Sequence, residues 1–106
     1  MRFMLKAILD TEKANAAAKA GNLGKTIQSI VTELKPEAAF FTDDHGKRTA
    51  YIFFDMRDAS QIPAVAEPWF LAFSAHVEFH PVMAPEDLAK AGPSIDQATK
   101  KYSPAA

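Results

Sequence analysis

Two histidines and a glutamate occupy alternate positions in the last third of the chain: His76, Glu78 and His80. On a β-strand, alternate side chains point to the same face, so a strand here sets both imidazoles and the carboxylate in one row. Imidazole exchanges protons near neutral pH, and a neighbouring carboxylate favours its charged form. The row is therefore compatible with acid–base chemistry, with metal binding or with a solvated, ion-paired surface.

The spacing of this row argues against one metal ion shared by both histidines. Alternate residues of a strand lie roughly 6.5–7 Å apart along its axis, so His76 and His80 are separated by about twice that distance. A neighbouring pair of these side chains would need further ligands, from Asp55, another strand or a second subunit, to complete a site. We accordingly expect no metal and no cofactor.

Four segments of the chain have the alternating or continuous apolar pattern of strands. They cover residues 3–9, 37–41, 49–56 and 76–82. Residues 43–47 have turn chemistry, so the second and third strands are expected to form a β-hairpin. The row of histidines lies on the fourth strand.

Two helical segments separate these strands. The first follows an N-cap at Asp10 or Thr11 and is expected to break near Gly21. The second starts near residues 58–60, and Pro68 is expected to kink or divide it. Both segments have apolar residues at helical spacing, which predicts that each buries one side against a sheet.

The order β-α-β-β-α-β is that of a split-βαβ, ferredoxin-like α+β domain. Its four-stranded antiparallel sheet has the strand order 4-1-3-2 and has two helices on one face. The other face is bare, and among its polar groups it carries Met4, Ile8, Tyr51 and Phe53. Exposed apolar faces usually mark interfaces, so we expect two sheets to pack face to face in a homodimer and to enclose a cleft.

The expected strand order also predicts a site. The first strand lies between the third and the fourth, which brings Lys6 beside the row of His76, Glu78 and His80. The third strand flanks Lys6 on its other side, and its residues are expected to contact a ligand: Tyr51, Phe53, Asp55 and Arg57. A mixed polar and aromatic lining is typical of small-molecule pockets. A register shift of one residue would reverse every one of these placements.

Composition limits the partners. The chain of 106 residues fits a single domain, 1–106, in which 84–106 are expected to form a short helix, ended by Gly92-Pro93, and a tail. The formal net charge is −1 without a basic stripe, which argues against nucleic acid. The chain has no cysteine, which excludes thiol catalysis and disulfides. Because no secretory signal or bilayer-length apolar stretch is present, we expect a cytoplasmic protein without a membrane partner.

The element order, Trp69-Phe70 late in the second helix, and the closing segment 77–86 carry a resemblance to a known group. That segment reads Val-Glu-Phe-His-Pro-Val-Met-Ala-Pro-Glu. Together these features resemble the dimeric α/β-barrel superfamily of small bacterial proteins, and most closely an uncharacterised family within it. The superfamily also contains muconolactone isomerase-like and antibiotic-biosynthesis monooxygenase-like proteins. The resemblance implies a homodimer with a cleft but transfers no catalytic motif.

The sequence thus favours a homodimer that binds a small, anionic or aromatic organic molecule on the open sheet face. A non-catalytic dimer that regulates or scaffolds a partner is an alternative. A further alternative, implied by the resemblance, is a cofactor-independent monooxygenase- or isomerase-like enzyme. In that case His76 or His80 would act as acid or base, Glu78 would orient the imidazole, and Lys6 would supply positive charge.

Overall fold

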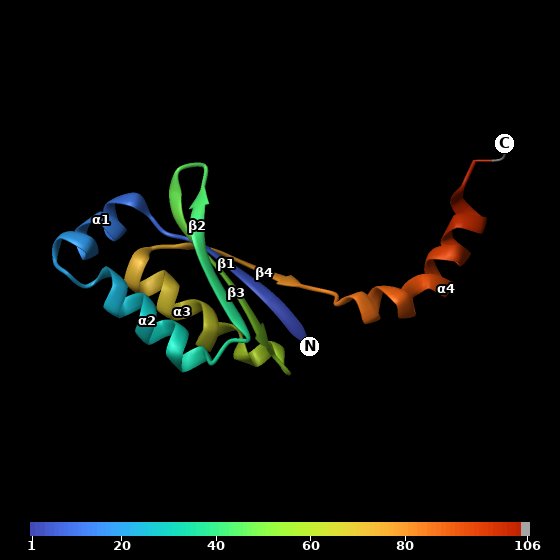
Figure 1. Ribbon diagram of the computed structural model, residues 1–106, viewed down its shortest axis with the longest axis horizontal. Helices are drawn as coiled ribbons and strands as arrows, with labels where there is room; N and C mark the ends of the chain where they lie inside the picture. The colour runs from blue at the N-terminus through green and yellow to red at the C-terminus, as the bar shows by residue number, and fades with distance from the viewer. Residues whose placement is uncertain (105–106) are drawn as a thin grey trace.

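A single four-stranded antiparallel sheet organises the chain (Figure 1). The computed structural model describes residues 1–104. The strand order is β2-β3-β1-β4, which is the expected 4-1-3-2 order read from the other edge. The strands are β1 (Arg2–Ile8), β2 (Ala38–Asp44), β3 (Lys47–Asp55) and β4 (His76–Pro81). The protein is therefore an α+β domain with an open sheet.

Three helices cover one face of this sheet, and a fourth follows the last strand (Figure 1). The first expected helical segment is two helices, because the chain turns at Gly21, whose φ is +78°. The second segment begins with the short 3₁₀ helix η1, which Asp58 caps. The α-helices are α1 (Thr11–Lys19), α2 (Leu23–Leu34), α3 (Ile62–Phe73) and α4 (Pro85–Tyr102). The simple β-α-β-β-α-β order is correct for the strands, but the helices are more numerous.

The core lies between the sheet and the helices α1 to α3. Leu5, Ile52 and Phe54 point to the helix side of the sheet and are completely or almost completely buried. Trp69 and Phe73 of α3 pack against each other and join the same cluster. Pro68, expected to kink or divide the helix, lies inside α3 and does not divide it. Burial of this apolar side offsets the hydrogen bond that a proline removes from a helix.

The C-terminal segment differs most from the expectation. Instead of a short helix that ends at Gly92-Pro93, α4 is 18 residues long and continues through both residues. Figure 1 shows that α4 projects away from the sheet and bends along its length. A proline inside a helix is an established cause of such a bend. The projection makes the described chain 62 Å long but only 29 Å and 21 Å in the other directions.

No helix among residues 1–104 is long and apolar enough to cross a membrane. In α4, the helix of greatest length, charged residues occur in both the first and the last turn.

We predict that the helix side of β1 dominates stability. Leu5→Ala removes a side chain with no exposed surface, so the free energy of unfolding should fall by about 2–5 kcal/mol. Leu71→Ala is the matched control, because Leu71 on α3 is 81% exposed and its loss should change stability by less than about 0.5 kcal/mol. Urea denaturation followed by circular dichroism measures both. Equal destabilisation by the two variants would contradict this account of the core.

Candidate functional site

The strand register brings the polar residues of three strands together on the face that the helices leave open. Lys6 of β1 lies directly opposite Glu78 of β4 and, on its other side, Tyr51 of β3. His80 lies opposite Met4, and His76 lies opposite Ile8, each two residues from Lys6 on the same face of β1. Because the helix-side residues of β1 are buried, the alternation of the strand leaves Lys6 on the opposite face. The structure thus places these side chains as the sequence predicted.

Glu78 lies between the two histidines and contacts both. Its Oε2 is 2.9 Å from His76 Nε2, and its Oε1 is 3.0 Å from His80 Nε2. A carboxylate only accepts hydrogen bonds, so each ring carries a proton on Nε2 and donates it. The bonds to His80 and His76 lower the pKa of Glu78 below its ordinary value. In the neutral imidazole, this arrangement leaves Nδ1 of each ring with a lone pair and free to accept a proton.

Lys6 has a carboxylate partner that the sequence analysis did not place in the site. Its Nζ lies 2.7 Å from Asp44 Oδ2 at the end of β2, two strands away. Both side chains are only about one-fifth exposed. The hydrogen bond to Asp44 raises the pKa of Lys6, and the same contact lowers the pKa of Asp44. Lys6 Nζ also lies over the Tyr51 ring, 5.7 Å from its centroid.

The position of Asp44 depends on the tight turn between β2 and β3. His45 and Gly46 both have positive φ, which is the geometry of a two-residue type I′ hairpin turn. Asp43 Oδ2 accepts a hydrogen bond from the Gly46 N–H and supports that turn. The strands consequently extend to Asp44, which the sequence analysis assigned to the turn. The sequence signal for this tight turn is the pair of acidic residues, Asp43 and Asp44, followed by His45 and Gly46.

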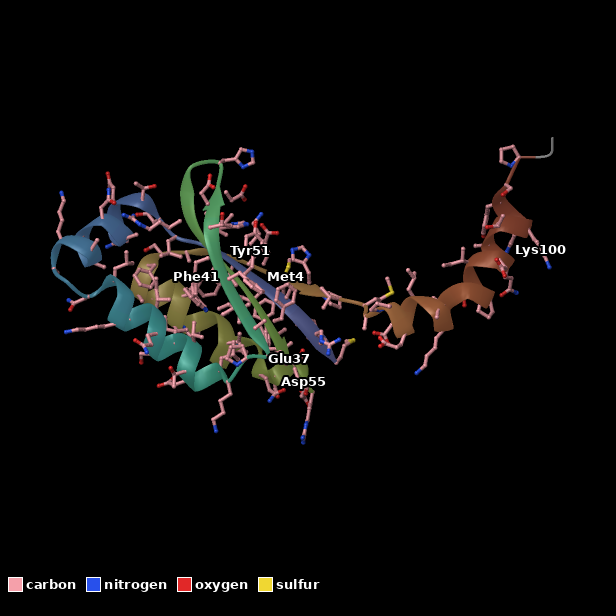
Figure 2. All side chains as sticks on the ribbon, viewed as in Figure 1. Met4, Glu37, Phe41, Tyr51, Asp55 and Lys100 are labelled. Atoms are coloured by element: carbon pink, nitrogen blue, oxygen red, sulfur yellow. The ribbon has the colours of Figure 1, made fainter. Side chains whose placement is uncertain are left out.

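Apolar and aromatic side chains adjoin the polar groups on the open face. Met4 lies opposite Phe53 of β3 and opposite His80 of β4. Phe40 of the edge strand β2 packs edge-on against Phe53 and is 60% exposed. Figure 2 shows Met4 and Tyr51 close together on the sheet. We call Lys6, Asp44, Tyr51, His76, Glu78 and His80, with the apolar Met4, Phe40 and Phe53, the open-face cluster.

Two of the expected ligand-binding residues lie outside this cluster. Asp55 is at the far end of β3, beside Glu37 in Figure 2, and its Oδ1 accepts a hydrogen bond of 2.9 Å from the N-terminal amino group. That contact lowers the pKa of Asp55. Arg57 follows the end of β3, and its backbone N–H donates to Gln61 Oε1. The strand ends before Arg57, so strand alternation no longer directs its side chain.

The open-face cluster is a surface in the single chain. Its histidines are largely exposed, His76 to 67% and His80 to 48% of the side chain. An apolar hollow of about 460 Å³ lies elsewhere, lined in part by Leu9, Ile27 and Ala50. Across residues 1–104, no three His, Asp or Glu side chains converge in a metal-binding group. An enclosed cleft over the cluster would require a second layer of structure packed on the open face of the sheet.

Comparison of the chain with protein-family models and with curated proteins finds no match.

The site predicts how stability depends on acidity. The pKa values of Asp44 and Glu78 are lowered in the folded protein, so both carboxylates stay charged at pH values where they take up protons in the unfolded chain. Their contribution is complete above their unfolded pKa values and is lost as the pH falls through the folded ones. Thermal unfolding followed between neutral pH and about pH 3 should therefore show a falling melting temperature.

Asp44→Asn should make this fall shallower, because one of the two paired carboxylates is gone. Asp96→Asn on α4 is the matched control, since Asp96 has no ion pair among the described residues. If the two variants show the same pH dependence as the parent protein, the contact between Lys6 and Asp44 does not form in solution.

Proposed function

We propose that the protein binds a small organic molecule at the open-face cluster, between the sheets of two copies. The observation that carries this proposal is the arrangement of Glu78, which holds two exposed imidazoles by their Nε2 atoms beside an apolar surface. Apolar surface with a few convergent polar groups is typical of ligand sites. A second sheet over Met4, Phe40 and Phe53 would bury this exposed apolar area.

The charges of the cluster favour one class of ligand. With neutral imidazoles, the positive charge of Lys6 is outweighed by the negative charges of Asp44 and Glu78. An aromatic molecule with a weakly acidic hydroxyl or carboxyl group fits this site, because its ring can pack on the aromatic side chains. The proton of a weakly acidic hydroxyl group can pass to Nδ1 of His76 or His80, and the resulting anion then faces a positively charged imidazole. A carboxyl group is already ionised near neutral pH and has no proton to transfer. Such proton transfer is the step that a cofactor-independent enzyme would use.

The pairing of Lys6 with Asp44 supports a second candidate function. A lysine whose charge is already satisfied within its own chain contributes less to a ligand than a free one. In a non-catalytic dimer, these ion pairs would keep the interface hydrated and would fix the alignment of the two sheets. Ligand binding distinguishes the two candidates, since a purely structural interface has no site to fill.

Binding of benzoate, used as a probe, tests the proposal. Titration followed by nuclear magnetic resonance should perturb the His76 and His80 ring signals. These signals are expected to respond because the benzoate ring packs on the aromatic side chains beside the two histidines. Replacing both rings, in His76→Gln with His80→Gln, should weaken binding by about tenfold or more.

Lys25→Met is the matched control for Lys6→Met, because Lys25 lies on α2 away from the open face. The Lys6 variant should bind benzoate more weakly, and the Lys25 variant should bind as the parent does. Binding that is unchanged in the double histidine variant and in Lys6→Met would show that the open-face cluster is not the site. Absence of any binding would favour the non-catalytic dimer.

A further inference from the structure

The C-terminal helix has no packing partner in the single chain. Val82 still bonds the sheet, through its N–H and the carbonyl of Arg2, and after it the chain leaves the domain (Figure 1). None of the ion pairs found among residues 1–104 joins α4 to another element. Lys100, labelled in Figure 2, lies far from the sheet. Beyond its first turn, the helix therefore has no side that is buried.

A helix of this composition needs an external contact to be stable. Gly92 and Pro93 lie in its interior, where both residues destabilise a helix relative to alanine and proline does so most. In proteins, most of the stability of a helix comes from packing of its apolar side and not from the helix propensity of its residues. In α3 the core offsets the comparable cost of Pro68, whereas in α4 no residue is buried. A partner for α4 is thus expected on energetic grounds.

The apolar residues of α4 show what kind of partner fits. Their spacing alternates between three and four residues, which is the repeat of a coiled-coil seam. The seam consists of Leu88, Ala91, Ile95, Ala98 and Tyr102. The three large members are exposed to half or more of their surface, and Tyr102 reaches 74%. A seam this narrow fits another helix, because a sheet face would require a wider apolar stripe.

We propose that α4 pairs antiparallel with α4 of a second copy of this chain. In antiparallel pairing, two of the three large residues of the seam face an alanine of the seam: Leu88 faces Ala98 of the second copy, and Ile95 faces its Ala91. Alternation of large and small side chains fills such an interface closely. A parallel pair would instead place Leu88 on Leu88 and Ala91 on Ala91.

The charges beside the seam complement each other in the same arrangement. Asp87 flanks the seam in the first turn and Lys101 flanks it in the last. Antiparallel pairing sets Asp87 beside Lys101 of the second copy at both ends, and Ser94 beside its own counterpart at the two-fold axis. Asp87 Oδ2 accepts the Ala84 N–H, which leaves Oδ1 for the lysine. A self-complementary surface of this kind forms a closed, two-fold symmetric contact.

Pro93 does not enter this contact. By the helical period of about 3.6 residues per turn, Pro93 lies on the side opposite the seam, together with Gln97 and Lys100. The two domains lie at opposite ends of the helix pair, so their open faces do not meet within it. The contact is consequently additional to any pairing of the sheets.

The molar mass of the full-length protein tests the pairing. Ile95→Glu places a charge in the seam and should lower the mass measured by light scattering, whereas Gln97→Glu on the opposite side should leave it unchanged. If the sheets do not pair, the parent is a dimer and the variant a monomer. If the sheets do pair, the parent is a larger assembly and the variant keeps only the sheet-paired dimer. A loss of mass is expected in both cases, which separates this result from that of the benzoate titration. Trp69 fluorescence reports whether the domain stays folded, because Trp69 is buried far from α4.

The orientation is tested by cross-linking and by charge reversal. The chain has no natural cysteine, so Ser94→Cys treated with a short bismaleimide should give a covalent dimer, and Gln97→Cys should not. Lys101→Glu should shift dissociation to higher protein concentration, and Lys100→Glu should not.

Three results would overturn the proposal. One is a mass that Ile95→Glu does not change, and another is a parent protein that is monomeric. The third is a lowered mass in Ile95→Glu with no cross-link at Ser94→Cys, which would indicate that α4 docks on the domain of the second copy instead.

Discussion

The two-residue alternation of β1 determines both faces of the protein. This strand lies in the middle of the sheet, paired with β3 on one side and with β4 on the other. Burial of Leu5 and Ala7 under the helices requires that Lys6, between them, point to the open face. The same alternation, transmitted through the register, positions Tyr51 and Glu78 beside Lys6. The open-face cluster is therefore a consequence of the core.

The hairpin turn adds the one member of the cluster that alternation in the inner strands does not specify. Asp44 comes from the edge strand β2, whose length depends on how tightly the chain turns at His45 and Gly46. A longer turn would leave Asp44 in a loop and Lys6 without its carboxylate. A local backbone conformation with positive φ thus sets the charge balance of a surface two strands away.

Much of this structure could be predicted from the sequence because strand alternation is a strong and local signal. The four strands follow from it, whereas their order follows from the β-α-β-β-α-β succession of elements. The shared face of Lys6, His76 and Glu78 follows from both. Asp44 could not be assigned, because a residue at the margin of a turn belongs to either element until pairing extends the strand. Arg57 was grouped with the cluster by extending alternation past the end of β3, where the chain no longer pairs.

The prolines of α3 and α4 also show where prediction from local sequence fails. A proline inside a helix weakens it, and the sequence rule that it kinks or ends a helix reflects that local cost. Pro68 is tolerated because Ala66, Trp69 and Phe73 are buried in the core around it. Pro93 has the same local cost and no core beside it, yet the helix continues for about two and a half further turns after it. The helix can continue past Pro93 despite this local cost only if the seam of α4 is buried too. In the described chain, no element lies against that seam, so the burial must come from another molecule, and the seam's own pattern of size and charge is complementary to itself.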